Sequence, residues 1–110
     1  MVLSTTPVQL LKNLRDAFHA GKVQWQKHAL AKMLERGISR EMVKQAVVAG
    51  ELIEYYPMDR PLPSCLILGG MGHETIHVVA AIEDSTGTAF VITAYFPDTK
   101  HFMSDLKTRR

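Results

Sequence analysis

The length, composition and charge of this chain limit what it can be. With 110 residues, 46% of them hydrophobic and 22% charged, the chain fits one compact domain and leaves no room for a second. Its single cysteine excludes an intrachain disulfide and any zinc cluster built from cysteines. No N-terminal apolar stretch is long enough for a signal or membrane segment, so we expect a cytoplasmic protein with no membrane partner. The net charge of +2 suits a nucleic-acid partner without demanding one.

The first half of the chain predicts three helices. The stretch Thr6–Gln9 combines an N-cap hydroxyl, a proline at the first helical position and a glutamine three residues after the cap. After a short connection, "KVQW", a second helix is expected from about Gln26 to Arg36, where Gly37 ends it. Ser39 caps a third helix. The residues expected to face the core are Leu10, Leu11, Leu14 and Phe18, then Leu30, Met33 and Leu34, then Met42, Val43, Ala46 and Val47.

The second half of the chain predicts strands, because its hydrophobic period falls to two. "ELIEYY" (51–56) and "CLILGG" (65–70) are rich in branched and aromatic residues, and the prolines of "PMDRPLPS" separate them. "TIHVVAAI" (75–82) and "AFVITAYF" (89–96) flank "DSTGT", as in a hairpin. We predict an α+β fold in which two or three N-terminal helices pack on a roughly four-stranded antiparallel sheet. The core-facing strand residues are expected to be Ile76, Val78, Ala80 and Ile82, and Phe90, Ile92, Ala94 and Phe96.

The stretch His73–His77 contains the letters HExxH, which bind zinc when they lie on a helix. Here "GGMG" precedes the motif and "TIHVV" is dense in β-branched residues, so a strand is expected instead. On a strand the two histidines lie roughly 13 Å apart, whereas each zinc ligand must lie about 2 Å from the metal. We therefore expect no metal site and no cofactor.

Several separated segments carry a family resemblance. "KHALAKMLERGIS", "GELIEYYPMDRPLPSCLIL", "IHVVAAIED" and "VITAYFPD" together resemble the bacterial family of domains of unknown function numbered 4258, whose members look like relatives of the RelE/ParE and BrnT toxins. The likeness covers roughly residues 25–98 of one single domain, with an extra N-terminal helix in 1–22 and a basic tail in 99–110. It implies a small helix-then-sheet fold of the toxin type, in which some relatives cleave messenger RNA and others bind different targets.

The second predicted helix carries a basic stripe. His28, Lys32 and Arg36 stand at positions i, i+4 and i+8, on one slowly drifting face that could hold a phosphodiester. The family signature often has arginine where this chain has Lys32, which keeps the charge but loses the bidentate fork. Arg60 adds a guanidinium on a loop, where it can meet a phosphate or a carboxylate. An ordinary solvated helix face would show the same pattern.

The predicted hairpin offers a second group of polar side chains. If "DSTGT" is a five-residue loop, Glu83 pairs with Ala89, and His77 then lies opposite Tyr95 on the face away from the core. A slip of one residue would destroy this alignment. Half-buried structural roles in the sheet would equally suit His77 and Tyr95.

These residues supply what metal-independent RNA cleavage needs. His77 or His28 could exchange the proton, and Tyr95 or Tyr56 could donate a hydrogen bond. The cations Lys32, Arg36 and Arg60 could stabilise the phosphate charge. The leading hypothesis is a toxin-like protein that either binds RNA or cleaves it as a metal-independent ribonuclease. The alternative is a non-catalytic module that binds an antitoxin-like protein partner, and a homo-oligomer is compatible with either.

Overall fold

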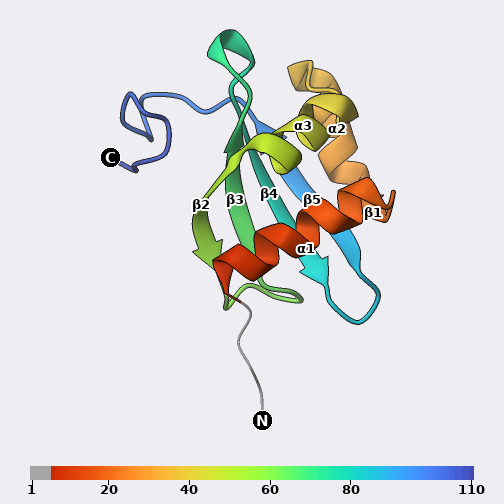
Figure 1. The fold of residues 1–110 in the computed structure, drawn as a ribbon. Helices are drawn as coiled ribbons and strands as arrows, with labels where there is room; N and C mark the ends of the chain where they lie inside the picture. The colour runs from red at the N-terminus through yellow and green to blue at the C-terminus, as the bar shows by residue number, and fades with distance from the viewer. Residues whose placement is uncertain (1–5) are drawn as a thin grey trace.

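The computed structural model describes residues 6–110, which form three helices and one five-stranded sheet (Figure 1). The first five residues of the predicted N-terminal segment lie outside the described range. An α+β fold is thereby confirmed. None of the helices in residues 6–110 is both long and apolar enough to cross a bilayer. The elements are α1 (Pro7–His19), β1 (Val23–Trp25), α2 (Lys27–Arg36), α3 (Arg40–Ala49), β2 (Glu51–Tyr56), β3 (Ser64–Gly69), the 3₁₀ turn η1 (Gly72–Glu74), β4 (Ile76–Glu83) and β5 (Thr88–Tyr95).

The sheet has one strand more than predicted, and it is mixed rather than antiparallel. Its order is β1-β5-β4-β3-β2, with β2 to β5 antiparallel and β1 parallel to β5. The stretch predicted as a connection, "KVQW", forms β1, in which Val23 pairs with Ala89 and Trp25 with Val91. Trp25 also packs edge-to-face on Phe18 of α1, with 6.1 Å between ring centroids. Three residues are too few to show an alternating pattern, so tertiary pairing alone reveals this strand.

The helix boundaries follow the capping signals. The Thr6 hydroxyl accepts a hydrogen bond from the backbone N–H of Gln9 at 3.1 Å, and the Ser39 hydroxyl accepts one from Met42 at 3.1 Å. Gly37 ends α2 in the left-handed conformation, with φ +72°. These contacts satisfy backbone groups that a helix end leaves unpaired.

All three helices cover one face of the sheet and bury a single core with it (Figure 1). The predicted inner faces of α1 and α3 are confirmed, since Leu14, Val43 and Val47 are fully buried. The prediction for α2 is wrong at Leu34, whose side chain is 84% exposed. Helix α2 contacts mainly β5, near the margin of the sheet, so a narrow stripe of Ala29 and Met33 suffices to bury it.

The β4–β5 hairpin contains two departures from the predicted register. Glu83 pairs with Thr88 rather than Ala89, so the loop is one residue shorter than expected. The shorter loop brings Ala89 and Val91 to the core in place of the predicted Phe90 and Ile92. A β-bulge then leaves Ile92 outside the ladder, so Ala94 faces the core as predicted, whereas Phe96 is 39% exposed. The two shifts cancel, because a bulge inserts one residue into one strand. His77 consequently lies opposite Tyr95, as predicted.

Helix α3 approaches the end of β3 very closely. A Cβ atom on Gly69 would lie 2.4 Å from the Cα of Ala46 in α3, and one on Gly50 would lie 2.4 Å from the carbonyl oxygen of Leu68. Only glycine permits such a backbone approach. The contact fixes α3 against the sheet and leaves the turn after β3 projecting beside the helix.

The residues after β5 fold back over the sheet. We name Asp98–Arg110 the C-terminal segment. Phe102 in this segment is only 3% exposed and forms a backbone bridge with Arg109. Because the segment contacts His77, which alternates with the core-facing Ile76 and Val78, it covers the sheet face opposite the helices. In Figure 1 the segment leaves the end of β5 and emerges beyond β2.

Candidate functional site

His77 lies in β4 beneath the C-terminal segment and is fully buried. Its Nε2 is 2.6 Å from the carbonyl oxygen of Leu106, and its Nδ1 is 3.2 Å from the Tyr95 hydroxyl. A carbonyl can only accept, so Nε2 carries the proton and Nδ1 accepts from Tyr95. The ring also packs edge-to-face on Phe102, with 4.6 Å between centroids. His77 is therefore a neutral imidazole with both nitrogens hydrogen-bonded.

The environment of His77 favours its neutral form. Burial lowers the pKa of the imidazole below its ordinary value of 6.5, and the hydrogen bond to Leu106 and the charge of Glu54 only partly oppose this. Burial likewise raises the pKa of Tyr95, so its hydroxyl stays protonated and can donate to Nδ1. In this arrangement the lone pair of Nδ1 already accepts the Tyr95 hydroxyl and is not free for a substrate proton.

The lowered pKa of His77 predicts that stability depends on pH. Between pH 6.5 and the lower folded-state pKa, the unfolded chain binds a proton that the folded chain does not. The contribution of neutral His77 to the free energy of unfolding should therefore have its full value above pH 6.5, and the free energy of unfolding should fall as the pH drops below 6.5. Urea unfolding at about pH 7.5 and about pH 5.5 measures the change.

Two glutamine variants control this pH experiment. His77→Gln keeps a donor and an acceptor but cannot titrate, so its stability should vary less over the same range. His28→Gln, at an exposed position of α2, should retain the wild-type dependence. Equal pH dependence in His77→Gln and the wild type would refute the assignment to His77.

Beside His77, the sheet face carries an ion pair between β2 and the C-terminal segment. The Nε and Nη2 of Arg109 donate to the Glu54 carboxylate at 2.8 and 3.0 Å, and the Tyr56 hydroxyl donates to the same carboxylate. Burial raises the pKa of Glu54, but the hydrogen bonds from Arg109 and Tyr56 outweigh it, and the net pKa is lowered. Burial and the bond to Glu54 raise the pKa of Tyr56 to about 12. Glu54 thereby fixes the orientation of the Arg109 guanidinium.

A pocket of about 510 Å³ opens between α2, the end of β5 and the C-terminal segment. The Nη1 of Arg36 donates to the carbonyl oxygen of Ala94 at 2.8 Å, which fixes this side chain at the pocket wall. No carboxylate within residues 6–110 forms an ion pair with Arg36. Phe96, 39% exposed, offers an aromatic surface. The lining residues are Arg36, Tyr95, Phe96, Asp98, His101, Phe102 and Arg109.

The charged residues of this pocket differ in whether they have an ion-pair partner. Asp98 is paired with His101 at 2.9 Å, and the hydrogen bond from His101 lowers the pKa of Asp98. Arg109 is balanced by Glu54. Arg36 is the guanidinium of the pocket that forms no ion pair within residues 6–110, and a guanidinium binds phosphate or carboxylate oxygens in a bidentate manner.

The structure brings together only part of the predicted site. Arg36 and Tyr95 line the same pocket, and Tyr95 contacts His77. Lys32 lies one turn before Arg36 and pairs with Glu35 at 3.4 Å. His28 lies at the other end of α2, about 12 Å from Arg36 along the helix axis.

Arg60 lies far from this group. It follows β2, whose last residue, Tyr56, belongs to the row of the sheet that contains Ala81. His77 and Tyr95 belong to a row four residues away on β4, roughly 13 Å along the strand. Arg60 donates to the carbonyl oxygens of Met58 and Asp59 in its own loop. One phosphodiester cannot contact both Arg60 and Tyr95.

Sequence reasoning missed Glu54, Phe102 and Arg109. The signal in β2 was present, because Glu54 and Tyr56 are two residues apart and share a strand face. The C-terminal segment carried a weaker signal, since Phe102 is the one aromatic ring of the phenylalanine, tyrosine or tryptophan type in a largely polar stretch. No local rule of sequence predicts that Phe102 packs against His77 of β4, because that strand ends at Glu83.

The HExxH letters do not lie on an α-helix. His73 belongs to the exposed turn η1, and His77 belongs to β4. His73 thus departs from the predicted strand because the glycines around Met71 allow a tight turn. Within residues 6–110, no three histidine, cysteine or acidic side chains are grouped so as to hold a metal ion.

The fold and the pocket define a small α+β protein with an arginine- and aromatic-lined pocket beside a buried histidine. The chain belongs to the family described as domain of unknown function DUF4258, whose family model matches residues 25–96, more than half of the chain. No curated protein matches the sequence. The matched residues end before the C-terminal segment, so Arg109 and Phe102 lie outside the family region.

Proposed function

We propose that this protein is a toxin-like RNA-binding protein of the RelE/ParE kind, and that the pocket beside Tyr95 receives an RNA phosphate. The observation that carries this proposal is the position of Arg36, which ends the basic stripe of α2 and lines one pocket with Tyr95 and Arg109. Phosphate contacts supply most of the sequence-independent affinity for nucleic acid. Phe96 beside the pocket suits stacking of an unpaired base, which favours single-stranded RNA.

Ribonuclease activity makes a stricter demand than binding. A general base must come within hydrogen-bond reach of the proton that it removes. Both nitrogens of His77 are occupied, by Tyr95 and by Leu106. RNA cleavage by His77 therefore requires the C-terminal segment to move, whereas RNA binding at the pocket does not.

Replacing Lys32 and Arg36 together by alanine is expected to weaken binding of single-stranded RNA. Each lost phosphate contact should also reduce the slope of log affinity against log salt by about 0.7. Both side chains lie on the surface of α2 and outside the core, so circular dichroism should report an intact fold. Fluorescence anisotropy with a labelled single-stranded RNA, measured at several salt concentrations, gives both quantities.

A second double variant controls for net charge. Lys12→Ala with Arg40→Ala removes the same two charges from α1 and α3 and should leave RNA affinity close to wild type. Equal weakening by both variants would show diffuse attraction rather than a site. A wild-type chain that binds no RNA at low salt would refute the proposed function.

A further inference from the structure

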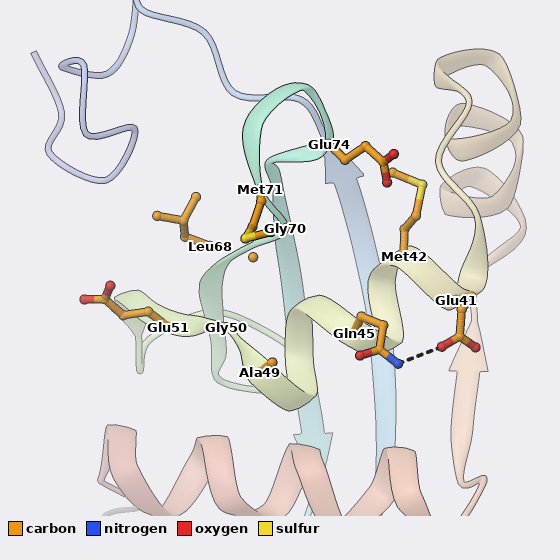
Figure 2. A pocket seen from close by; sticks show the side chains of 11 residues that line it. Glu41, Met42, Gln45, Ala49, Gly50, Glu51, Leu68, Gly70, Met71 and Glu74 are labelled. Carbon is orange, nitrogen blue, oxygen red and sulfur yellow. Dashed lines mark hydrogen bonds between the residues drawn. The ribbon is translucent and has the colours of Figure 1, made fainter.

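A cavity of about 950 Å³ forms a groove between α3 and the turn that follows β3 (Figure 2). The close contact between Gly69 and α3 forms its floor. In Figure 2, Glu41, Met42 and Glu74 lie toward one end of the groove and Glu51 lies at the other. No residue that lines this groove also lines the pocket beside Tyr95. The two are separate sites.

The groove is negatively charged, whereas the whole chain has a positive net charge. The described lining residues include three glutamates and no lysine, arginine or histidine, although the whole chain has a net charge of +2. Glu51 is partly balanced by Lys107 at 3.4 Å. Glu41 and Glu74 form no ion pair within residues 6–110. The groove is therefore most negative at the end that carries these two carboxylates.

Between the carboxylates the surface is apolar and adaptable. Met71 is 85% exposed, and Met42 lines the groove beside it. Methionine is unbranched and polarizable, so it can adjust to the shape of a partner side chain. An apolar surface rimmed by polar residues is typical of a protein interaction site.

We propose that this groove binds a basic amphipathic segment of a partner protein. The apolar face of that segment would contact Met42 and Met71, and its lysine or arginine side chains would approach Glu41 and Glu74. RNA does not fit, because its phosphates would face carboxylates. This proposal does not depend on RNA binding at the pocket beside Tyr95, and it adds protein binding as a second function of the chain.

A synthetic amphipathic helix of leucine and lysine, labelled with a fluorophore, probes the groove directly. Glu41→Lys with Glu74→Lys is expected to weaken its binding about ten-fold or more, because like charges then meet across the interface. Glu35→Lys with Asp84→Lys makes the same change in net charge at exposed positions outside the groove and should bind within about two-fold of wild type. Equal weakening by the two double variants would overturn the proposal.

The apolar contact has its own matched pair. Met71→Ala should weaken peptide binding several-fold, whereas Met58→Ala, at a 76% exposed position outside the groove, should not. Amide chemical shifts should change at residues 68–71 when the peptide binds. A peptide with glutamate in place of lysine should not bind, and its binding with similar affinity would contradict the proposal.

Two further outcomes separate this inference from the proposed function. RNA affinity should be retained in Met71→Ala and Met58→Ala, so loss of peptide binding alone tests the groove. Leu34 is exposed on the basic helix α2, so a second copy could offer a similar segment. In a competition experiment, unlabelled protein would displace the labelled peptide if the groove binds a second copy of the chain. If the chain self-associates, and Leu34→Asp abolishes both this self-association and the displacement of the peptide, the groove binds a second copy. The proposal of a separate partner is then wrong.

Discussion

Val47→Asp is expected to leave the chain unfolded at room temperature. Val47 lies on the inner face of α3 and has no exposed surface, so the variant would bury a carboxylate in the apolar core. The cost is several kcal/mol, against a total stability of roughly 5–15 kcal/mol for a domain of this kind. Circular dichroism and the dispersion of amide resonances distinguish a folded from an unfolded chain.

The same substitution at two other positions controls this prediction. Val8→Asp, at an 80% exposed position in the first turn of α1, should fold like the wild type, because a carboxylate there is hydrated and favourable to the helix dipole. Ile92→Asp should cost less than Val47→Asp, since Ile92 is only half-buried and lies in the bulge. Cooperative unfolding of Val47→Asp at the wild-type urea midpoint would contradict the burial of α3.

The sequence was most informative where one local rule decided the structure. Capping residues located all three helices, while branched and aromatic composition located β2 and β3 and alternation located β4 and β5. Burial was harder to predict. Leu34 is exposed because only a narrow stripe of α2 meets β5, and Ile92 leaves the ladder because of a bulge that no residue type announces.

The candidate site shows the same limit. The alignment of His77 with Tyr95 was predicted correctly, but only because a shorter loop and a bulge offset each other. Arg36 reaches the pocket because α2 packs over β5. The spacing of residues within α2 does not predict which strand the helix packs against. Glu54 and Arg109 meet across 55 residues of sequence, so their ion pair follows from the fold and not from any motif.

Phe102→Ala is expected to release the C-terminal segment from the sheet. The Phe102 ring is 3% exposed, packs against His77, and lies beneath the Arg109 guanidinium at 4.8 Å. Truncating a buried phenylalanine costs about 3–5 kcal/mol, which is large for a short segment held by few buried groups. Amides in 98–110 should exchange faster with solvent, while those of β3 and β4 remain protected. The pKa of His77 should rise toward its ordinary value of 6.5.

Met103→Ala is the neighbouring control, because Met103 is 46% exposed and its truncation should leave the segment in place. The ribonuclease form of the proposal can then be tested directly. With His77 uncovered in Phe102→Ala, RNA cleavage should exceed that of the wild type. Adding His77→Ala should remove it, since proton transfer contributes about 10²- to 10⁴-fold to the rate. If Phe102→Ala frees the segment, binds RNA and still cuts nothing, His77 is a structural residue that anchors the C-terminal segment, and the protein binds RNA without cleaving it.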